Sequence, residues 1–407
     1  MQYVIIGNST AATFAIEGIR AVDKAGSITV ISDETRPAYG RPLISYYLYG
    51  RIKLENTDYR SASFYTDNGV TVKYGVRAEK IDPEKKNVAL SDGSTIGYDK
   101  LLVATGSSPL VPPAEGLDTV PYHTFMTMDS ALALEKELSP EKRVLVVGAG
   151  LIGLKCVEGI LDRVGSVTVV DLAARILPSI LDAEGSAIVQ ERLEACGVNF
   201  VLGDCAVRYA PGLATLRSGK EVPFDILVIA AGVRPNVSLV REAGGEVNRG
   251  IVVNDRQETT IPDVYAAGDN CESYDICSGT RRILALLPNA AFQGETAGRN
   301  MAGGDAAFDK AAPFNALGLF DTHIATAGVY EGEAYTDTSE GYKKLFVKDN
   351  KLVGFILIDC IERAGIYTSL IREQTPLDTV DFELLKKNPA LMAFARGARA
   401  EILTRRR

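Results

Sequence analysis

Tryptophan is absent from this chain of 407 residues, and histidine occurs only at His123 and His323. With so few histidines, we expect neither a histidine-based metal site nor a hydrolase that depends on a Ser-His pair, and we predict no bound metal. No apolar run approaches the roughly 20 residues that a helix needs to cross a bilayer. No basic region or cleavage site precedes the first apolar run, so we expect a cytoplasmic protein.

Cysteine is also scarce, and an excess of basic side chains occurs near the C-terminus. The six cysteines begin only at Cys156 and lack metal-ligand spacing, so we expect reduced, structural thiols. The formal net charge of −8 argues against a nucleic-acid partner. Residues 384–407 differ, with seven basic side chains and one acidic side chain. Such a segment is either a solvated helix end or a site that steers an acidic partner.

Glycine, in contrast, is abundant, and two glycine-rich turns follow one plan. Apolar residues 3–6 lead into a turn over 7–12 and a helical pattern that ends near Val22. Apolar residues 144–147 lead into a turn over 148–153 and a helical pattern that ends near Arg163. A second β-rich run follows each helix, at 28–31 and at 167–170. Both segments are therefore predicted to be β-α-β units.

The second turn has the full dinucleotide-binding spacing, with Gly148, Gly150 and Gly153. The first glycine permits a tight turn, the second lets the backbone approach a pyrophosphate, and the third lets the helix pack on the strand. The helix N-terminus then attracts the phosphates. Asp171 ends the next strand, where a carboxylate accepts hydrogen bonds from ribose hydroxyls and repels a 2′-phosphate. We therefore predict NADH rather than NADPH at this site.

The first turn is less regular, because Ser9 and Ala12 follow Gly7 at the second and third glycine positions. Alanine is accepted at the third position, whereas serine at the second is a departure. The Ser9 hydroxymethyl group must point away from a pyrophosphate or donate a hydrogen bond to it. This turn alone is weak evidence, and the repetition of the plan carries the prediction.

A second pair of matching segments supports the repeat. Residues 101–109 and 226–235 each form an apolar strand, a turn of small residues with glycine, and a proline. Residues 260–269 form a further strand that ends in Gly268 and Asp269. We therefore predict an α/β fold with two Rossmann-like dinucleotide-binding domains, one for FAD and one for NAD, and a C-terminal α+β interface domain.

With the segment Pro-Ala-Tyr-Gly-Arg-Pro-Leu-Ile-Ser at 37–45, these motifs resemble the FAD/NAD-linked reductases of the pyridine nucleotide-disulfide oxidoreductase superfamily. The segment is similar to the FAD-contacting Arg-Pro-x-x-Ser loop of rubredoxin reductases, ferredoxin reductases and the flavin part of nitrite reductases. The resemblance covers residues 1 to about 375 and implies the cofactors FAD and NADH/NAD+. It implies that Asp269 binds the ribityl chain of FAD, that Arg41 and Pro42 lie along the cofactor, and that Ala78 touches the adenine through its backbone.

The complete sets of cofactor-binding residues follow from the motifs and the resemblance together. The FAD set also contains Gly7, Ser9, Thr10, Ala11, Ala12, Ala104, Thr105, Gly106, Gly268 and Pro288, and its ribose-binding side chain is Ser32, Asp33 or Glu34. The NAD set contains Gly148, Gly150, Leu151, Ile152, Gly153, Asp171, Ala231 and Gly232.

Three departures from the family narrow the chemistry. The disulfide-reducing relatives need a cysteine pair near Ser45, and others need one cysteine there, but no cysteine precedes Cys156. The flavin is therefore predicted to be the only redox centre on that side, with thiol chemistry at Cys271 or Cys277 as an alternative. The ferredoxin-reductase branch has a tryptophan beside the flavin. Its absence here favours the rubredoxin-reductase and nitrite-reductase branches.

The third departure concerns two positions that pair beside the flavin in most relatives. A lysine and a glutamate stand there in relatives, where this chain has Tyr46 and Lys155. We predict that Lys155 is the replacement cation and stabilises the anionic reduced flavin, and that Tyr46 forms a hydrogen bond with it. Both residues are therefore catalytic candidates. The alternative is that Lys155 extends from a solvated helix.

The resemblance assigns residues 1–112 and 237–308 to the FAD-binding domain, 113–236 to the NAD-binding domain and 309–407 to the interface domain. In the last we predict a hairpin of 344–347 and 352–358 across Asp349-Asn350, then a helix over 364–374. A further helix is predicted from Asn388-Pro389, with an apolar face of Leu391, Phe394, Ala398 and Ile402 for the core or for a homodimer contact.

The resemblance implies that hydride passes from NADH to the flavin, and that electrons then pass to a small iron–sulfur protein, either rubredoxin or ferredoxin-like. Three alternatives are an NADH oxidase, the flavin subunit of a larger anaerobic dehydrogenase, and a non-enzymatic NADH sensor similar to apoptosis-inducing factor.

Overall fold

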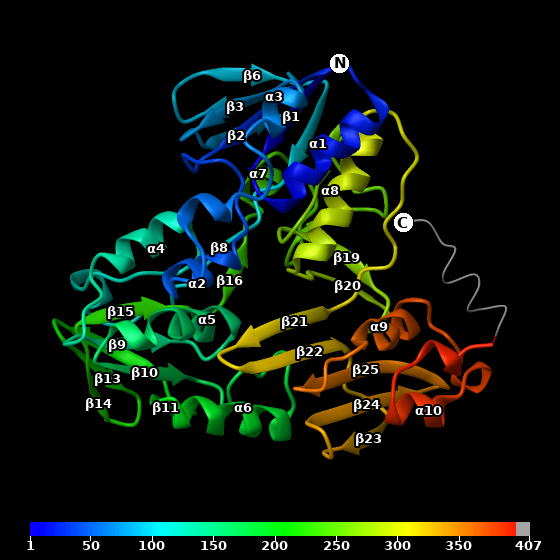
Figure 1. Ribbon diagram of the computed structural model, residues 1–407. Helices are drawn as coiled ribbons and strands as arrows, with labels where there is room; N and C mark the ends of the chain where they lie inside the picture. Colours follow the sequence, from blue (N-terminus) through cyan, green and yellow to red (C-terminus); the bar gives the residue numbers. More distant parts are fainter. Residues whose placement is uncertain (396–407) are drawn as a thin grey trace. The chain divides into compact units, whose positions relative to one another are not determined.

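A computed structural model describes residues 1–395 of the chain (Figure 1). The chain divides into two compact units. The first contains 1–174, 196–274 and 281–311, and the second contains 175–195, 275–280 and the residues from Ala312 onward. Among the described residues, no helix combines the length and the apolar character that a bilayer crossing requires.

The first unit contains a five-stranded parallel sheet in the order β18-β7-β1-β2-β3. Its strands are β1 (Gln2–Ile6), β2 (Ser27–Ser32), β3 (Val70–Tyr74), β7 (Lys100–Val103) and β18 (Val264–Ala266). Helix α1 (Thr10–Val22) joins β1 to β2, as predicted. Strands β2 and β3 lie on one side of β1, and β7, which comes later in the chain, lies on its other side. The strand order therefore reverses between β1 and β7, and ligands bind at the carboxyl ends of the strands at such a switch point.

The same unit contains a four-stranded parallel sheet in the order β11-β10-β9-β15. Its strands are β9 (Arg143–Val147), β10 (Ser166–Asp171), β11 (Val198–Leu202) and β15 (Ile226–Ile229). Helix α5 (Leu151–Ile160) and the 3-10 helix η3 (Leu161–Arg163) join β9 to β10. The two predicted β-α-β units and the predicted fold class are therefore confirmed, and the switch point of this sheet lies between β9 and β15.

Further elements also lie in the first unit, except that Asp275 at the end of one strand and Thr280 at the start of another belong to the second. The short strands are β4 (Ala78–Asp82), β5 (Asn87–Leu90), β6 (Thr95–Gly97), β8 (Ser107–Pro109), β12 (Ala206–Ala210), β13 (Leu213–Leu216), β14 (Glu221–Pro223), β16 (Val233–Pro235), β17 (Ile251–Val252), β19 (Cys271–Asp275) and β20 (Thr280–Arg282). The helices are α2 (Leu43–Leu48), η1 (Leu54–Thr57), α3 (Phe64–Asp67), η2 (Leu117–Thr119), α4 (Met128–Glu135), α7 (Ser238–Glu242) and α8 (Leu287–Met301). Strands β8 and β16, which end the two matching segments of the sequence, pair with each other in antiparallel register.

Helices α1 and α8 lie side by side in Figure 1 and pack through small residues. A Cβ atom added to Gly294 would lie 2.1 Å from the Ala11 carbonyl oxygen, and one added to Gly298 would lie 2.1 Å from the Ala15 carbonyl oxygen. Both distances are far shorter than van der Waals contact, so no larger residue fits without separating the helices. This close packing fixes the position of α1, whose first turn follows Gly7.

The second unit contains a five-stranded antiparallel sheet in the order β21-β22-β25-β24-β23. Its strands are β21 (Phe314–Leu319), β22 (Thr322–Gly328), β23 (Glu333–Asp337), β24 (Tyr342–Lys348) and β25 (Lys351–Ile358). The predicted hairpin is confirmed, with Asp349 and Asn350 at φ 50° and 60° in its turn. Helix α9 (Ala364–Arg372) follows.

Helix α6 (Ala183–Ala195) belongs to the second unit although it lies between β10 and β11 in the sequence. The Tyr342 hydroxyl, which has one proton to donate, lies 2.9 Å from an Asp182 carboxylate oxygen and 2.7 Å from a Glu184 carboxylate oxygen. The Lys344 ammonium group is 2.8 Å from a carboxylate oxygen of each of the same two residues. These charged contacts attach the beginning of α6 to β24.

The predicted helix from Asn388-Pro389 is wrong. Helix α10 (Phe382–Lys387) ends at Asn388, and Ala390 has the extended angles φ −135° and ψ 145°. Between this helix and residue 395, where the description ends, the 3-10 turn η5 (Leu391–Ala393) is the only further helical element; the turn η4 (Leu377–Thr379) precedes α10. Phe394 is buried and forms a β-bridge with Val380, and this tertiary contact holds the segment extended. Ala398 and Ile402 of the predicted apolar face lie outside the described residues.

Candidate functional site

The two glycine turns have the same geometry at the carboxyl ends of their sheets. Gly7 has φ +108°, and a Cβ atom on it would lie 2.1 Å from the Ala104 carbonyl oxygen of the neighbouring strand end. Gly148 has φ +119°, and its Cβ would lie 2.2 Å from the Ala230 carbonyl oxygen. Both positions therefore require glycine for backbone conformation and for space. Each turn lies at the switch point of its sheet.

The remaining turn residues separate a packing role from a binding role. A Cβ atom on Gly153 would lie 1.9 Å from the Gly148 carbonyl oxygen, whereas one on Gly150 would meet nothing within 4 Å. The third glycine thus permits packing, and the second faces open space, as close approach of a pyrophosphate requires.

The helix N-termini at both turns also fit a phosphate. Ser9 and Gly150 are the N-caps of α1 and α5, and neither helix has a side-chain capping hydrogen bond. Helix α1 begins with the buried residues Thr10, Ala11 and Ala12. The first N–H groups of these helices are therefore not used by a side-chain cap, and a pyrophosphate is a suitable acceptor for them.

The side chains after β2 differ sharply in their surroundings. The Ser32 hydroxyl is buried and donates to the Glu34 carbonyl, and Asp33 is exposed. The Glu34 carboxylate is held by the Arg41 guanidinium at 2.5 Å and by the Tyr39 hydroxyl at 2.7 Å. Of the three candidates for the ribose contact, only Glu34 thus has a carboxylate fixed in place.

Tyr39 is a hub that the sequence reasoning missed. Its buried hydroxyl donates to Glu34, accepts from Arg41 at 3.3 Å and accepts from the Met128 backbone N–H at 3.0 Å. Burial, together with the bond to Glu34, raises the Tyr39 pKa, so the hydroxyl stays protonated and keeps donating to Glu34. Its place between Pro37 and Ser45 was the only sequence signal for this role.

Arg41 connects the two acids of the proposed FAD site. Burial raises the pKa of Asp269, and the positive charge of Arg41 lowers it. The effect of burial is the larger one, so the Asp269 pKa lies above its usual value. Arg41 therefore binds Glu34 directly, while its charge acts on Asp269 against the effect of burial.

One further contact positions a turn of the FAD set. The amide oxygen of buried Gln293, on α8, accepts from the Gly268 backbone N–H at 2.6 Å and so fixes the turn before Asp269. Pro288 lies in the first turn of the same helix, which has no side-chain cap. Gln293 had no distinguishing signal in the sequence.

Ala78 lies close to the ribose candidates through its neighbours in the chain. The Val76 N–H donates to the Ser32 carbonyl at 2.9 Å, and the Gly75 N–H donates to the Glu34 carbonyl at 3.2 Å. Ala78 itself is buried at the start of β4. Pro42, by contrast, is exposed as the N-cap of α2.

Asp171 occupies the predicted position at the end of β10, and its carboxylate contacts the glycine turn. One oxygen accepts from the Ala149 N–H at 2.6 Å, and the other accepts from the Ala173 N–H at 2.7 Å. Gly232 follows β15 and has φ +111° and no atom within 4 Å of an added Cβ, and Ala231 is half-buried before it. Leu151 is exposed and Ile152 half-buried in the first turn of α5.

Lys155 and Tyr46 meet, as predicted, but the contact is with the aromatic ring. The Lys155 ammonium lies over the face of Tyr46, 4.7 Å from the ring centroid. Lys155 also forms an ion pair with Glu158, one helical turn further along α5. Lys155 is therefore not an ordinary solvated lysine, because its side chain is largely buried.

The six cysteines are free thiols in the structure. Cys271 is buried, and its thiol donates to the Gly268 carbonyl at 3.4 Å. Burial and nearby carboxylates raise its pKa, and burial also raises that of Cys156, so both thiols are held in the unreactive protonated form. Cys271 thus has the character of a packed turn residue.

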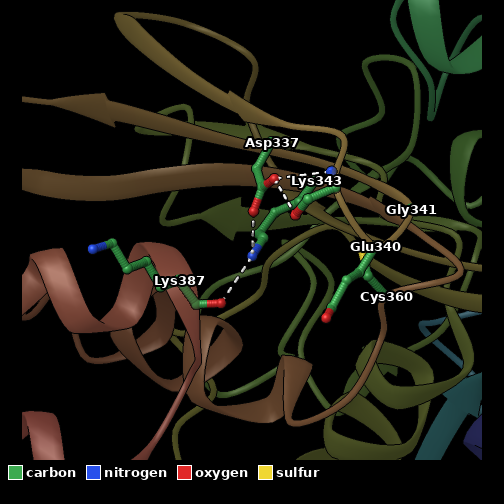
Figure 2. A pocket seen from close by; sticks show the side chains of 7 residues that line it. Asp337, Glu340, Gly341, Lys343, Cys360 and Lys387 are labelled. Carbon is green, nitrogen blue, oxygen red and sulfur yellow. Dashed lines mark hydrogen bonds and ion pairs between the residues drawn. The ribbon is translucent and has the colours of Figure 1, made fainter.

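A polar cavity lies within the second unit (Figure 2). Its lining residues come from a part of the sequence that contains neither glycine turn. Its volume is about 220 Å³. The Lys343 ammonium is bound there by Asp337 at 3.2 Å and by the Lys386 and Lys387 carbonyls at 2.9 and 3.2 Å. These acceptors match its three N–H groups, so Lys343 serves to fasten α10 to the sheet. The lining residues are Asp337, Ser339, Glu340, Gly341, Lys343, Cys360 and Lys387.

Two dinucleotide sites at two switch points, together with an antiparallel C-terminal unit, define a flavin-linked pyridine nucleotide oxidoreductase. Residues 1–294 match the model of the family described as pyridine nucleotide-disulphide oxidoreductase, and residues 313–375 match the rubredoxin NAD+ reductase C-terminal domain. The chain belongs to the pyridine nucleotide-disulphide oxidoreductase family. Its cofactors are FAD and NAD(H), which confirms that prediction.

Two known proteins that are similar to the chain differ in how much of their own length the match covers. The NADH-dependent phenylglyoxylate dehydrogenase subunit epsilon of Aromatoleum evansii is 32% identical over 390 residues, covering 92% of each chain. A nitrite reductase [NAD(P)H] of Bacillus subtilis is 30% identical over 406 residues, covering 95% of this chain but 49% of that protein. The chain therefore spans about half the length of that relative.

Among solved structures, the reductase in a covalent putidaredoxin reductase–putidaredoxin complex superposes with a TM-score of 0.86. It is 23% identical, and the match covers 95% of this chain and 96% of that one. At this identity the likeness shows the fold. The predicted resemblance to the rubredoxin-reductase and nitrite-reductase branch is confirmed by the family matches and the relatives.

Proposed function

We propose that the chain oxidises NADH through bound FAD and delivers the electrons to a small iron–sulfur protein of the rubredoxin or ferredoxin type. The observation that carries the proposal is the pair of glycine turns with matching geometry, each at a switch point, in a chain with no cysteine before Cys156. The match of residues 313–375 to a rubredoxin NAD+ reductase domain supports this kind of acceptor.

The residues of the first turn would hold FAD. N–H groups at the start of α1 bind the pyrophosphate, Glu34 binds the adenosine ribose, and Asp269 binds the ribityl chain. Tyr39 and Arg41 keep the Glu34 carboxylate in place. Bound FAD supplies the redox chemistry, since it accepts hydride from NADH and releases two electrons singly.

The residues of the second turn would hold NADH. Asp171 accepts from the ribose and repels a 2′-phosphate, so NADH is preferred to NADPH. The whole reaction converts one NADH and two oxidised one-electron acceptors into NAD+, one proton and two reduced acceptors. Because hydride carries both electrons from NADH, no thiol is required at any step.

A second candidate is the flavin subunit of a larger dehydrogenase. The end-to-end likeness to the phenylglyoxylate dehydrogenase subunit epsilon favours it. In that case the protein would exchange electrons between NADH and an iron–sulfur centre of a partner subunit. The chemistry at FAD is the same, and only the acceptor protein differs.

Steady-state NADH oxidation with a panel of acceptors tests the proposal. We expect fast turnover with rubredoxin or ferredoxin, and slow turnover with dioxygen alone. Fast turnover with dioxygen and no gain from either protein would instead identify an NADH oxidase. Reduction by NADH followed by very slow reoxidation with every acceptor would identify an NADH sensor and reject the proposed reductase.

A further inference from the structure

Helices α2 and α5 connect the two proposed nucleotide sites. Helix α2 follows Arg41, which binds Glu34 of the proposed FAD site. Helix α5 begins directly after Gly150 of the proposed NADH site. A Cβ atom on Gly159 of α5 would lie 3.1 Å from the Leu48 Cβ of α2, so the helices approach closely. The contact of Lys155 with Tyr46 joins the same two helices, and the proposed function requires FAD and NADH to meet between the turns that precede them.

The charge in this contact is paired. Glu158 carries the partner carboxylate of Lys155, and their side chains are only 5% and 14% exposed. The Arg51 guanidinium also lies over the Tyr46 ring, 5.9 Å from its centroid. Charges that are removed from water act over longer distances than exposed ones, and a buried cation next to a buried anion exerts a much smaller net field than either alone.

Glu158 therefore affects the charge that the proposed FAD site experiences. We propose that Glu158 is a positioning residue that holds the Lys155 ammonium over Tyr46 and cancels most of its charge, so that the flavin faces a neutral ion pair. The inference rests on the proposed function, because it assumes FAD at the first glycine turn. It revises the expectation of an unopposed cation at Lys155.

The sign of the change in flavin midpoint potential distinguishes the neutral pair from an unopposed cation. Lys155→Met leaves a carboxylate that opposes the anionic reduced flavin, and it should lower the equilibrium constant for flavin reduction about tenfold, or about 30 mV for two electrons. Glu158→Gln leaves the cation and should raise the constant by a similar factor. The double variant Lys155→Met/Glu158→Gln removes both charges and should stay within about threefold of the unchanged protein.

The experiment is a spectroscopic redox titration of the FAD-loaded protein with dithionite and reference dyes. Asp162→Asn, an exposed carboxylate in η3 just after α5, is the matched control and should leave the potential unchanged. If Glu158→Gln leaves the potential unchanged, or if the double variant matches Lys155→Met, Glu158 does not screen the cation and the inference is overturned.

Two features keep the result decisive. Each single variant removes one charge of a buried ion pair and can fail to fold, whereas the double variant removes both charges together. On its own it separates a neutral pair, which predicts an unchanged potential, from a lone cation, which predicts a lowered one. The titration needs no acceptor protein, so failure to turn over rubredoxin or ferredoxin would reject the proposed function without affecting this result.

Discussion

Asp171 offers the sharpest prediction about the NADH site, because its carboxylate has two separable roles. Its two oxygens accept backbone N–H groups from Ala149 in the glycine turn and from Ala173. We also expect it to bind the ribose and to repel a 2′-phosphate. In Asp171→Asn, one oxygen can still accept, whereas the amide NH2 group faces an N–H donor and cannot.

The size of the effect follows from the hydrogen bonds lost. A hydrogen bond to a charged group contributes about 1.5–3 kcal/mol, and about 1.4 kcal/mol corresponds to a factor of ten. We therefore expect kcat/KM for NADH to fall about 10- to 100-fold. For NADPH, the loosened turn and the lost repulsion act in opposite directions, so its kcat/KM should change by less than about tenfold, and the preference for NADH should shrink.

The assay is steady-state oxidation of NADH and of NADPH with ferricyanide as a common acceptor. Asp225→Asn is the matched control, because Asp225 also accepts a backbone N–H, from Arg143 at 2.8 Å, at the opposite end of the same sheet. Its NADH to NADPH ratio should equal that of the unchanged protein. Equal kcat/KM values for NADH and NADPH in the unchanged protein, or an unaltered ratio in Asp171→Asn, would refute the reasoning.

Further predictions concern FAD binding and stability. Tyr39→Phe removes the hydroxyl that fixes Glu34 and should weaken FAD binding about 5- to 30-fold, as one or two lost hydrogen bonds imply; equal dissociation constants by equilibrium dialysis would contradict this role. Gly298→Ala forces a methyl group to within 2.1 Å of a carbonyl oxygen of α1, so the melting temperature and the bound FAD should fall, whereas Gly365→Ala in α9, with nothing within 4 Å, should do neither. Hydrogen bonds from the Ser339 hydroxyl and N–H, and then Lys343, lower the Asp337 pKa from 3.8 to about 2. The ionised Asp337 therefore stabilises the folded state above pH 3.8, and this contribution is lost as the pH falls toward 2. A denaturant midpoint that falls as steeply in Asp337→Asn as in the unchanged protein over this range would be the contrary result.

The parts of the fold that repeat were predictable from the sequence, because the chemistry of a dinucleotide turn restricts the residues. Positive φ and the lack of space beside a neighbouring strand end both require glycine at positions 7 and 148. A buried strand followed by glycine therefore pointed to a dinucleotide-binding turn. The hairpin at Asp349-Asn350 was equally direct, since both residues tolerate the positive φ that its turn requires. These signals are local and independent of the rest of the chain.

Other features depend on contacts between distant segments. Gln293 has no distinctive neighbourhood in the sequence, and Tyr39 is marked only by its place in the 37–45 segment. Their roles arise because folding brings Gln293 to Gly268 and Tyr39 to Glu34. The pairing of Lys155 with Glu158 was within reach, since three residues separate them on a helix, but the burial that gives the pair its importance was not visible. The segment after Asn388 has a good helix start, yet the contact of Phe394 with Val380 holds it extended.

Anaerobic titration of the FAD-loaded protein with NADH is the decisive test of the proposed reaction. We expect one FAD to bind per chain and one equivalent of NADH to reduce it fully, with no further electron uptake when dithionite is added. A protein that binds no FAD, or one that takes up four electrons with a thiolate-to-flavin charge-transfer band, would contradict the proposed reaction.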